Sequence, residues 1–129
     1  MINEQSETQY SKVATQAYLY ALDKKMKPFD AWRKAAEEII TMQTTRDKGC
    51  PCATFIGLCE SGDLVSIDKT IQNGSHNYLY AKFAVKEWKK DNAISKAAMW
   101  SKIREQFPDG AANHQGQLDV VNGIWKYIR

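Results

Sequence analysis

Apolar residues recur every three or four positions along most of the chain, the spacing that puts them on one face of an α-helix. In residues 6–24, Tyr10, Val13 and Ala17 follow this spacing, and most positions between them are polar. The same period continues through residues 30–43, 51–60, 75–90, 92–107 and 115–128. The pattern predicts an all-α fold of about six helices in a single compact domain, residues 1–129, with one short central helix.

Residues that cap or break helices set the predicted boundaries. Pro28 is expected to stop the first helix, and the turn at 108–110 to end the fifth. Polar residues suited to the N-cap position precede three of the other helices: Asp30, Ser75 and Asn92. Residues 44–48 are predicted to form a polar loop. Residues 63–69 fit either a short strand or a single helical turn, so both remain open.

The segment 47–62 is the predicted centre of the fold, and it holds all three cysteines. Pro51 suits the first helical position, where a missing N–H costs nothing, and Gly62 can close the helix in a left-handed conformation. Gly57 lowers helix stability by about 1 kcal/mol relative to alanine. A glycine at that position indicates that another helix comes close. We expect a short, packed connecting helix.

Cys50, Cys52 and Cys59 raise the possibility of a zinc site. A structural zinc ion takes four ligands, so His76 or His114 would have to complete the set. The paired C-x-x-C spacing typical of zinc sites is absent. We therefore expect neither a metal nor another cofactor, and we interpret Cys59 as a small buried apolar residue.

A reactive thiol is the second possible use of these cysteines. The positive end of a helix stabilises a thiolate, so Cys50 or Cys52, close to Lys48, could be acidic. A thiol enzyme also needs a base, and nothing in the spacing brings His76 or His114 to a cysteine. A thiol-dependent enzyme or redox protein remains an alternative rather than the leading hypothesis.

Composition and charge place the chain among ordinary globular proteins. Apolar residues make up 43% and charged residues 26%, and the formal net charge is +3. No apolar run approaches the 18 or so residues of a membrane span, and the first seven residues do not resemble a signal peptide. Three cysteines do not form a disulfide framework. We expect a cytoplasmic protein without a membrane partner.

Basic residues gather on two of the predicted helices, where they outnumber the acids. Most such groups are simply solvated, but this one could also attract an acidic protein surface or a phosphate backbone. Two tyrosines, each two positions from another tyrosine, are predicted to point outward and to add protein-binding contacts. The candidate partner-binding residues are Tyr20, Tyr80, Lys82, Lys86, Lys89 and Lys90.

The helices predicted over 30–43 and 51–60 also raise a helix-turn-helix interpretation, with the second as the recognition helix. That helix offers Cys52, Thr54 and Glu60 but no arginine, lysine, asparagine or glutamine to read base edges. Nucleic-acid binding is thus an alternative that we do not favour.

The run Lys48-Gly49-Cys50-Pro51, followed by Phe55-x-Gly57-Leu58-Cys59-Glu60-x-Gly62, resembles a family of small bacterial proteins of unknown function. Leu118-Asp119-Val120-Val121 with Trp125 is similar to the C-terminal helix of that family. The resemblance implies a helical fold and no particular activity. In size and type alone, the chain is also similar to the immunity proteins that neutralise nuclease toxins.

These observations together favour a non-enzymatic protein-binding domain over an enzyme. We expect an immunity protein that binds and neutralises a bacterial nuclease toxin, its cognate partner, by shape and charge complementarity. The helix-turn-helix and thiol interpretations remain the alternatives.

Overall fold

The computed structural model describes residues 8–109 and 116–129, and within these ranges the secondary structure is helical. The one strand-like pairing there is an isolated bridge between Leu64 and Ile128. The predicted all-α fold is confirmed. The helices are α1 (Gln9–Asp23), α2 (Pro28–Ile39), α3 (Gln43–Arg46), α4 (Gly49–Glu60), α5 (His76–Lys90), α6 (Lys96–Gln106), α7 (Gln117–Gly123) and the 3-10 turn η2 (Trp125–Tyr127).

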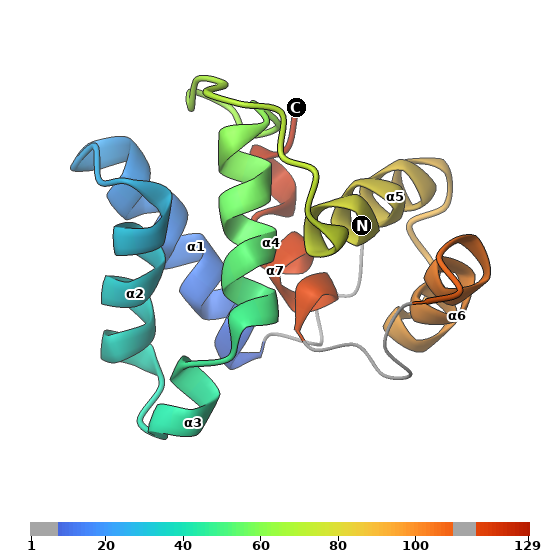
Figure 1. Cartoon of the computed structure of the whole chain (residues 1–129), viewed down its shortest axis with the longest axis horizontal. Helices are drawn as coiled ribbons and strands as arrows, with labels where there is room; N and C mark the ends of the chain where they lie inside the picture. Colours follow the sequence, from blue (N-terminus) through green and yellow to red (C-terminus); the bar gives the residue numbers. More distant parts are fainter. Residues whose placement is uncertain (1–7, 110–115) are drawn as a thin grey trace.

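Helix α4 stands in the middle of the molecule and packs against α2, α5 and α7 (Figure 1). Helices α1 and α2 form a pair on one side of it, and α6 lies against the outer side of α5. Along the whole of α4, only Gly49 is fully exposed to solvent. The central position predicted for this segment is therefore confirmed.

Two glycines of the central segment have the roles that the sequence predicts. A Cβ added to Gly57 would lie 2.6 Å from the Cβ of Tyr78, so α5 packs directly against α4 at this point. Gly62 has a φ of +76°, the left-handed conformation that glycine adopts most easily, and it follows the end of α4.

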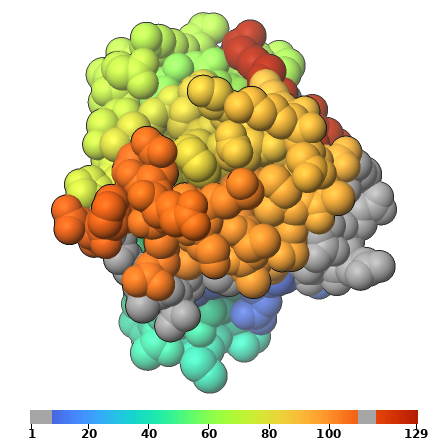
Figure 2. Space-filling model, turned by 90° about the vertical axis from the view of Figure 1, so that its right-hand side faces the viewer, coloured from blue at the N-terminus to red at the C-terminus, as the bar shows by residue number. Residues whose placement is uncertain are grey.

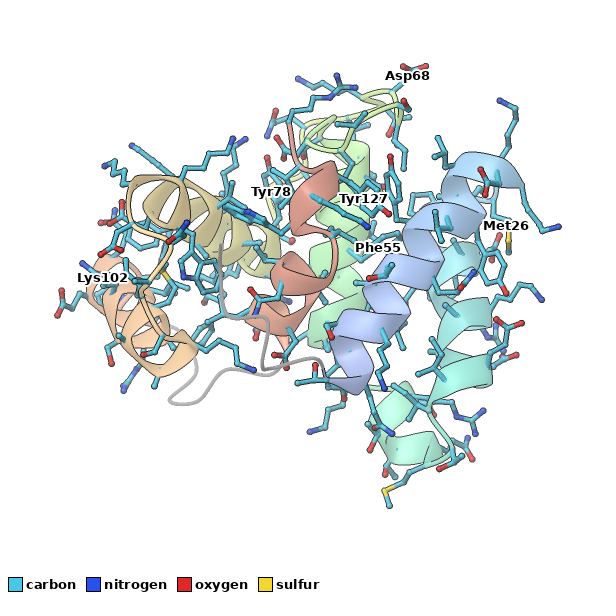
Figure 3. The ribbon with its side chains drawn as sticks, turned by 180° about the vertical axis from the view of Figure 1, so that it is seen from behind. Met26, Phe55, Asp68, Tyr78, Lys102 and Tyr127 are labelled. Atoms are coloured by element: carbon cyan, nitrogen blue, oxygen red, sulfur yellow. The ribbon has the colours of Figure 1, made fainter. Side chains whose placement is uncertain are left out.

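Aromatic side chains from several helices fill the core. Phe55 is fully buried in the middle of the molecule (Figure 3), with its ring 5.6 Å from that of Trp32. The buried Tyr18 stacks on Tyr127 at 4.1 Å, and its hydroxyl donates to the carbonyl of Val65 at 2.6 Å. Burial of one such ring contributes about 1.5–3 kcal/mol. These contacts join the helix pair α1–α2 to α4 and to the end of the chain.

The predicted starts of two helices are wrong. Helix α2 begins at Pro28, and Asp30 lies in its first turn rather than at the N-cap. Proline is well suited to this first position because its missing N–H would have no partner there. Helix α6 is capped by Ser95, not Asn92, since the Ser95 hydroxyl accepts from the N–H of Ala98. Ser75 does cap α5, as predicted.

Three connecting segments also differ from the sequence-based prediction. Residues 44–48 are not simply a loop, because α3 makes one helical turn there, and α4 begins at Gly49, two residues before Pro51. Residues 63–69 form neither a strand nor a helical turn beyond the Leu64 bridge. The last helix ends at Gly123, where a Cβ would collide with the backbone of Ser11 in α1.

The helices are of ordinary length for a globular domain. Among the described residues the longest are α1 and α5, at 15 residues each, whereas a membrane span needs about 20 apolar residues. Within residues 8–109 and 116–129, no helix has both the length and the apolar character for crossing a membrane.

Candidate binding groove

Most of the α5 lysines that are predicted to bind a partner make polar contacts within the fold instead. Figure 2 shows the side of the molecule that α5 and α6 form. Lys82 pairs with Asp63 at 2.7 Å, and Lys89 donates to the carbonyl oxygen of Arg129 at 2.6 Å. Lys90 lies 3.5 Å from Glu87 on the same helix. Of these four lysines, only Lys86 has neither an ion pair nor such a hydrogen bond among the described residues.

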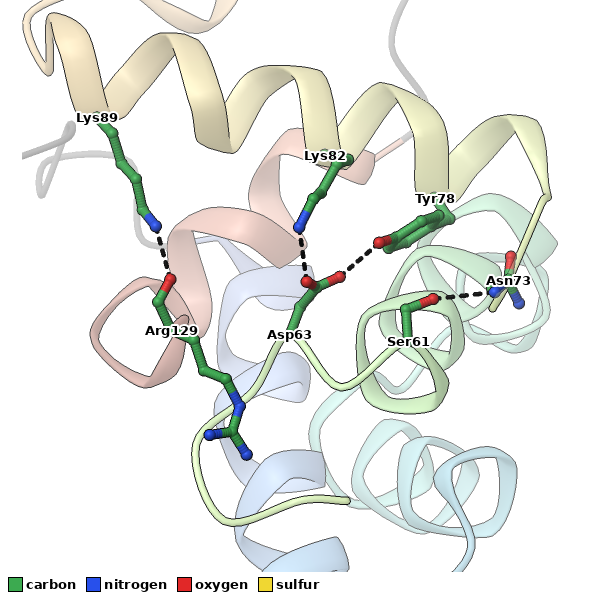
Figure 4. A network of polar contacts seen from close by, with 7 residues as sticks. All are labelled: Ser61, Asp63, Asn73, Tyr78, Lys82, Lys89 and Arg129. Atoms are coloured by element: carbon green, nitrogen blue, oxygen red, sulfur yellow. Dashed lines mark hydrogen bonds and ion pairs between the residues drawn. The ribbon is translucent and has the colours of Figure 1, made fainter. Parts of the chain in front are cut away.

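Asp63 links α5 to the loop after α4 (Figure 4). One oxygen of its carboxylate accepts from Lys82, and the other accepts from the Tyr78 hydroxyl at 2.6 Å. Burial, together with this hydrogen bond, raises the pKa of Tyr78, while the hydrogen bond to Asp63 raises the pKa of Lys82. Both groups therefore stay protonated at neutral pH, and the cluster is a structural junction between α5 and the loop after α4.

The two tyrosines predicted to point outward do not form a shared surface. Tyr80 is only 6% exposed, so its predicted orientation is wrong. Helix α6 covers it, with Trp100 and Phe107 packed edge-on against its ring. Tyr20 is half-buried and donates a hydrogen bond to Glu38, which ties α1 to α2.

Two of the three cysteines, Cys52 and Cys59, lack the environment that a reactive thiol needs. Burial raises the pKa of Cys52 to about 11 and raises that of Cys59 further, so the predicted acidity of Cys52 is wrong. Cys50 is half-exposed, and His76 lies on α5. The predicted alternative base, His114, lies outside the described residues. In the described ranges, no three His, Cys, Asp or Glu side chains gather where they could hold a metal ion.

The helix predicted to read DNA is α4, and its surroundings do not suit that role. A recognition helix must project from the surface to enter a major groove. Helix α4 instead packs against three other helices, and Pro51, Thr54 and Phe55 are buried. The helix-turn-helix arrangement is not the one that the chain adopts.

Residues of α2, of α3 and of the start of α4 line a groove between α2 and α4. Figure 1 shows where these three helices lie. Its volume is about 370 Å³. Helix α3 is held in place by Tyr10 of α1, whose hydroxyl donates to the Thr45 carbonyl at 2.9 Å. The groove is lined by Phe29, Trp32, Arg33, Ala36, Glu37, Gln43, Arg46, Asp47, Lys48, Gly49 and Cys52.

One wall of the groove is apolar. Trp32 and Ala36 come from the buried face of α2, and Cys52 comes from α4. Phe29 also lines the groove and is 52% exposed. Exposure of a single apolar side chain is common, but an exposed aromatic beside a groove provides a contact area for a partner.

Two cations of the lining, Arg46 and Lys48, make no ion pair with a described residue. Arg33 pairs with Glu37 at 3.4 Å. The Nε of Arg46 is buried and has no hydrogen-bond partner, and none of the ion pairs among the described residues includes Arg46. A buried donor left unsatisfied costs about 1–3 kcal/mol, and more when it is charged. The rest of the guanidinium belongs to a half-buried side chain that lines the groove.

The N-terminus of α4 opens beside Arg46 and adds positive potential. Its N-cap residue, Lys48, makes no side-chain hydrogen bond to the helix, and the first turn contains no acidic residue. No acidic side chain within the first turn offsets the partial positive charge of the helix end, although Asp47 precedes the N-cap and lines the groove. Gly49 leaves the approach open, because an added Cβ there would meet no atom within 4 Å.

The sequence-based reasoning missed this groove. Arg46 falls in the predicted polar loop, where a charged side chain is unremarkable, and the prediction has no turn of helix at that place. The sequence carries no signal at Phe29 either, because it lies three positions before Trp32 and seven before Ala36, the spacing of a shared core face. Only the packed structure shows that its side chain is 52% exposed beside the groove.

Comparison with known proteins gives a family but no activity. Neither the curated proteins nor the solved structures contain a match to the chain. The model of one protein family matches residues 7–128, almost the whole chain. This agrees with the expected membership of an uncharacterised family. The chain belongs to DUF6979, a family of unknown function.

Proposed function

We propose that this chain is a non-enzymatic protein-binding domain whose binding site is the groove between α2 and α4. The observation that carries the proposal is the groove itself, with an apolar wall, an exposed Phe29 and an unpaired Arg46. Interfaces are enriched in exposed aromatics and arginine, which are the residues most often responsible for binding energy.

The shape of the groove favours a segment of a protein over a small molecule. Pockets for small molecules bury most of the ligand surface. Here the lining follows α2 from Phe29 to Glu37, a rise of about 12 Å, and it is open to solvent. An extended chain covers that distance with about four residues. Met42, next in sequence to the lining residue Gln43, is a further apolar side chain that is 64% exposed.

An immunity protein that neutralises a toxin is the specific form of this proposal. The net charge of +3 and the unpaired Arg46 suit an acidic surface on the toxin. Co-expression with the cognate toxin is expected to restore growth. Loss of this protection when the groove is filled would support the role, whereas equal protection by a chain with a filled groove would contradict it.

Two glycine variants test the site without disturbing the fold. Gly49 lines the groove, and Gly74 lies in the loop before α5, away from it. An added Cβ would meet no atom within 4 Å at either position, and neither backbone has a positive φ. Gly49→Leu therefore takes up space that an occupant needs, and Gly74→Leu is a matched control.

The experiment selects ligands from a phage-displayed library of random dodecapeptides and measures the affinity of the selected peptides. We expect wild type and Gly74→Leu to bind them equally and Gly49→Leu to bind at least tenfold more weakly, a difference of about 1.4 kcal/mol. Failure to select any peptide, or equal binding by Gly49→Leu, would overturn the proposal.

A further inference from the structure

We infer that the groove between α2 and α4 recognises an acidic segment of the partner, in which an Asp or Glu lies next to a large apolar residue. The carboxylate pairs with Arg46, and the apolar side chain packs on Trp32 and Phe29. This inference rests on the proposed function and specifies the chemistry of the occupant.

Arg46 makes no ion pair with a described residue. Its half-buried side chain lines the groove, as do two carboxylates. Glu37 is already paired with Arg33, and Asp47 is exposed and makes no ion pair with a described residue. A carboxylate matches the planar guanidinium and accepts two parallel hydrogen bonds from it. The geometry leaves that place to an incoming group.

Other positive charges beside Arg46 strengthen the preference for an anion. Lys48 lines the groove and is exposed, and α4 begins immediately after it without a capping side chain or an acidic residue in its first turn. A negative group near such a helix end is stabilised by the helix dipole. Thus three features of different kinds, a guanidinium, an ammonium and a helix end, attract the same charge.

The apolar wall favours a peptide segment over a free inorganic anion as the occupant of the groove. Trp32 and Ala36 are only 3% exposed, so the half-exposed Phe29 ring supplies most of the apolar surface, which phosphate or sulfate does not use. Burial of an apolar side chain against this wall supplies the hydrophobic part of the binding energy. A segment with adjacent acidic and apolar residues contacts both the cationic and the apolar parts of the lining at once.

The test compares Arg46→Gln with Arg104→Gln, a substitution of an exposed arginine on α6, away from the groove. Peptides selected from the dodecapeptide library by the wild type are expected to share an acidic residue next to a large apolar one. One selected peptide is then compared with its analogue in which the acidic residue is replaced by its amide. Circular dichroism on heating confirms that each variant is folded.

For wild type and Arg104→Gln, we expect the amide analogue to bind at least tenfold more weakly than the acidic peptide. For Arg46→Gln, the two peptides should bind alike, because the group that distinguishes them is gone. Lys48→Gln provides a second variant and should weaken the discrimination without abolishing it. Selected peptides without acidic residues, or unchanged discrimination by Arg46→Gln, would overturn the inference. If Gly49→Leu still bound those peptides more weakly than the wild type, the groove would remain a binding site. Only the inferred preference for an acidic residue would then be wrong.

Discussion

At the scale of single residues, local surroundings decide what each side chain does. Cys52 and Gly49 belong to the same helix and line the same groove, yet Cys52 is half-buried and Gly49 is exposed. Position near a helix start predicted an acidic thiol for Cys52. The pKa of Cys52 is raised instead, because burial disfavours the charged thiolate.

The thiol of Cys52 is predicted to react slowly at neutral pH. Because its pKa is about 11, only a small fraction is thiolate at pH 7, and the rate of alkylation should rise with pH up to about that value. The fold holds this pKa above the usual 9.0, so the free energy of unfolding should decline as pH rises from 9.0 toward 11. Iodoacetamide labelling, with mass spectrometry to assign the modified cysteine, measures the rate. Fast labelling of Cys52 that reaches a plateau below pH 8 would contradict the assignment.

Gly57→Ala is predicted to destabilise the protein although alanine is the better helix former. The added Cβ would lie 2.6 Å from the Cβ of Tyr78, so α4 and α5 must move apart. Overpacking of this kind costs about 1–3 kcal/mol, which exceeds the gain of about 1 kcal/mol in helix propensity. Urea denaturation measures the change in the free energy of unfolding.

The matched control is Gly49→Ala, in the same helix but with open space around the new methyl group. It should leave the free energy of unfolding unchanged or raise it slightly. Equal stability of the two variants would mean that α5 does not pack on α4 as closely as the structure shows.

At the scale of elements, a few polar contacts fix how the helices meet. The network around Asp63 joins the loop after α4 to α5, and Lys89 reaches the carbonyl of Arg129 at the end of the chain (Figure 4). Tyr10 ties α3 to α1 in the same way. These contacts come from residues far apart in the sequence. No local pattern indicates them, so the contacts of Lys82 with Asp63 and of Lys89 with Arg129 could not be predicted.

Asp63→Asn is predicted to destabilise the protein by about 1–3 kcal/mol. The substitution removes the charge that accepts hydrogen bonds from Tyr78, which is buried, and from Lys82. Chemical denaturation measures the loss. As a control, Lys90→Gln breaks the exposed contact with Glu87 and should cost less than about 0.5 kcal/mol. The junction would have no structural role if Asp63→Asn were as stable as Lys90→Gln.

At the scale of the whole molecule, the helical periodicity was enough to predict the class of fold. The period of three to four residues depends only on which side of a helix faces the core, and that information is local. The centre of the molecule was also predictable, because Gly57 and Gly62 have conformational and packing requirements that other residues do not meet. The helix starts at Pro28 and Ser95 were missed since several nearby residues can cap a helix equally well.

The candidate site was the part that the sequence could not provide. Whether a residue such as Tyr80 points to solvent depends on which helix covers it, and α6 covers it here. The groove likewise depends on the distance between α2 and α4, which is set by tertiary packing. Lys102, in contrast, extends outward from α6 at the edge of the molecule (Figure 3), as expected for a solvated lysine.

The claim that the groove between α2 and α4 is the binding site has one direct test. A selected peptide is titrated into uniformly ¹⁵N-labelled protein, and the shifts of the backbone amide signals are followed by NMR. We predict that the largest shifts fall in residues 29–37 and 46–52, while the signals of Lys86 and its neighbours on α5 stay unchanged. Shifts concentrated on α5 and α6, with the groove residues unaffected, would contradict the account.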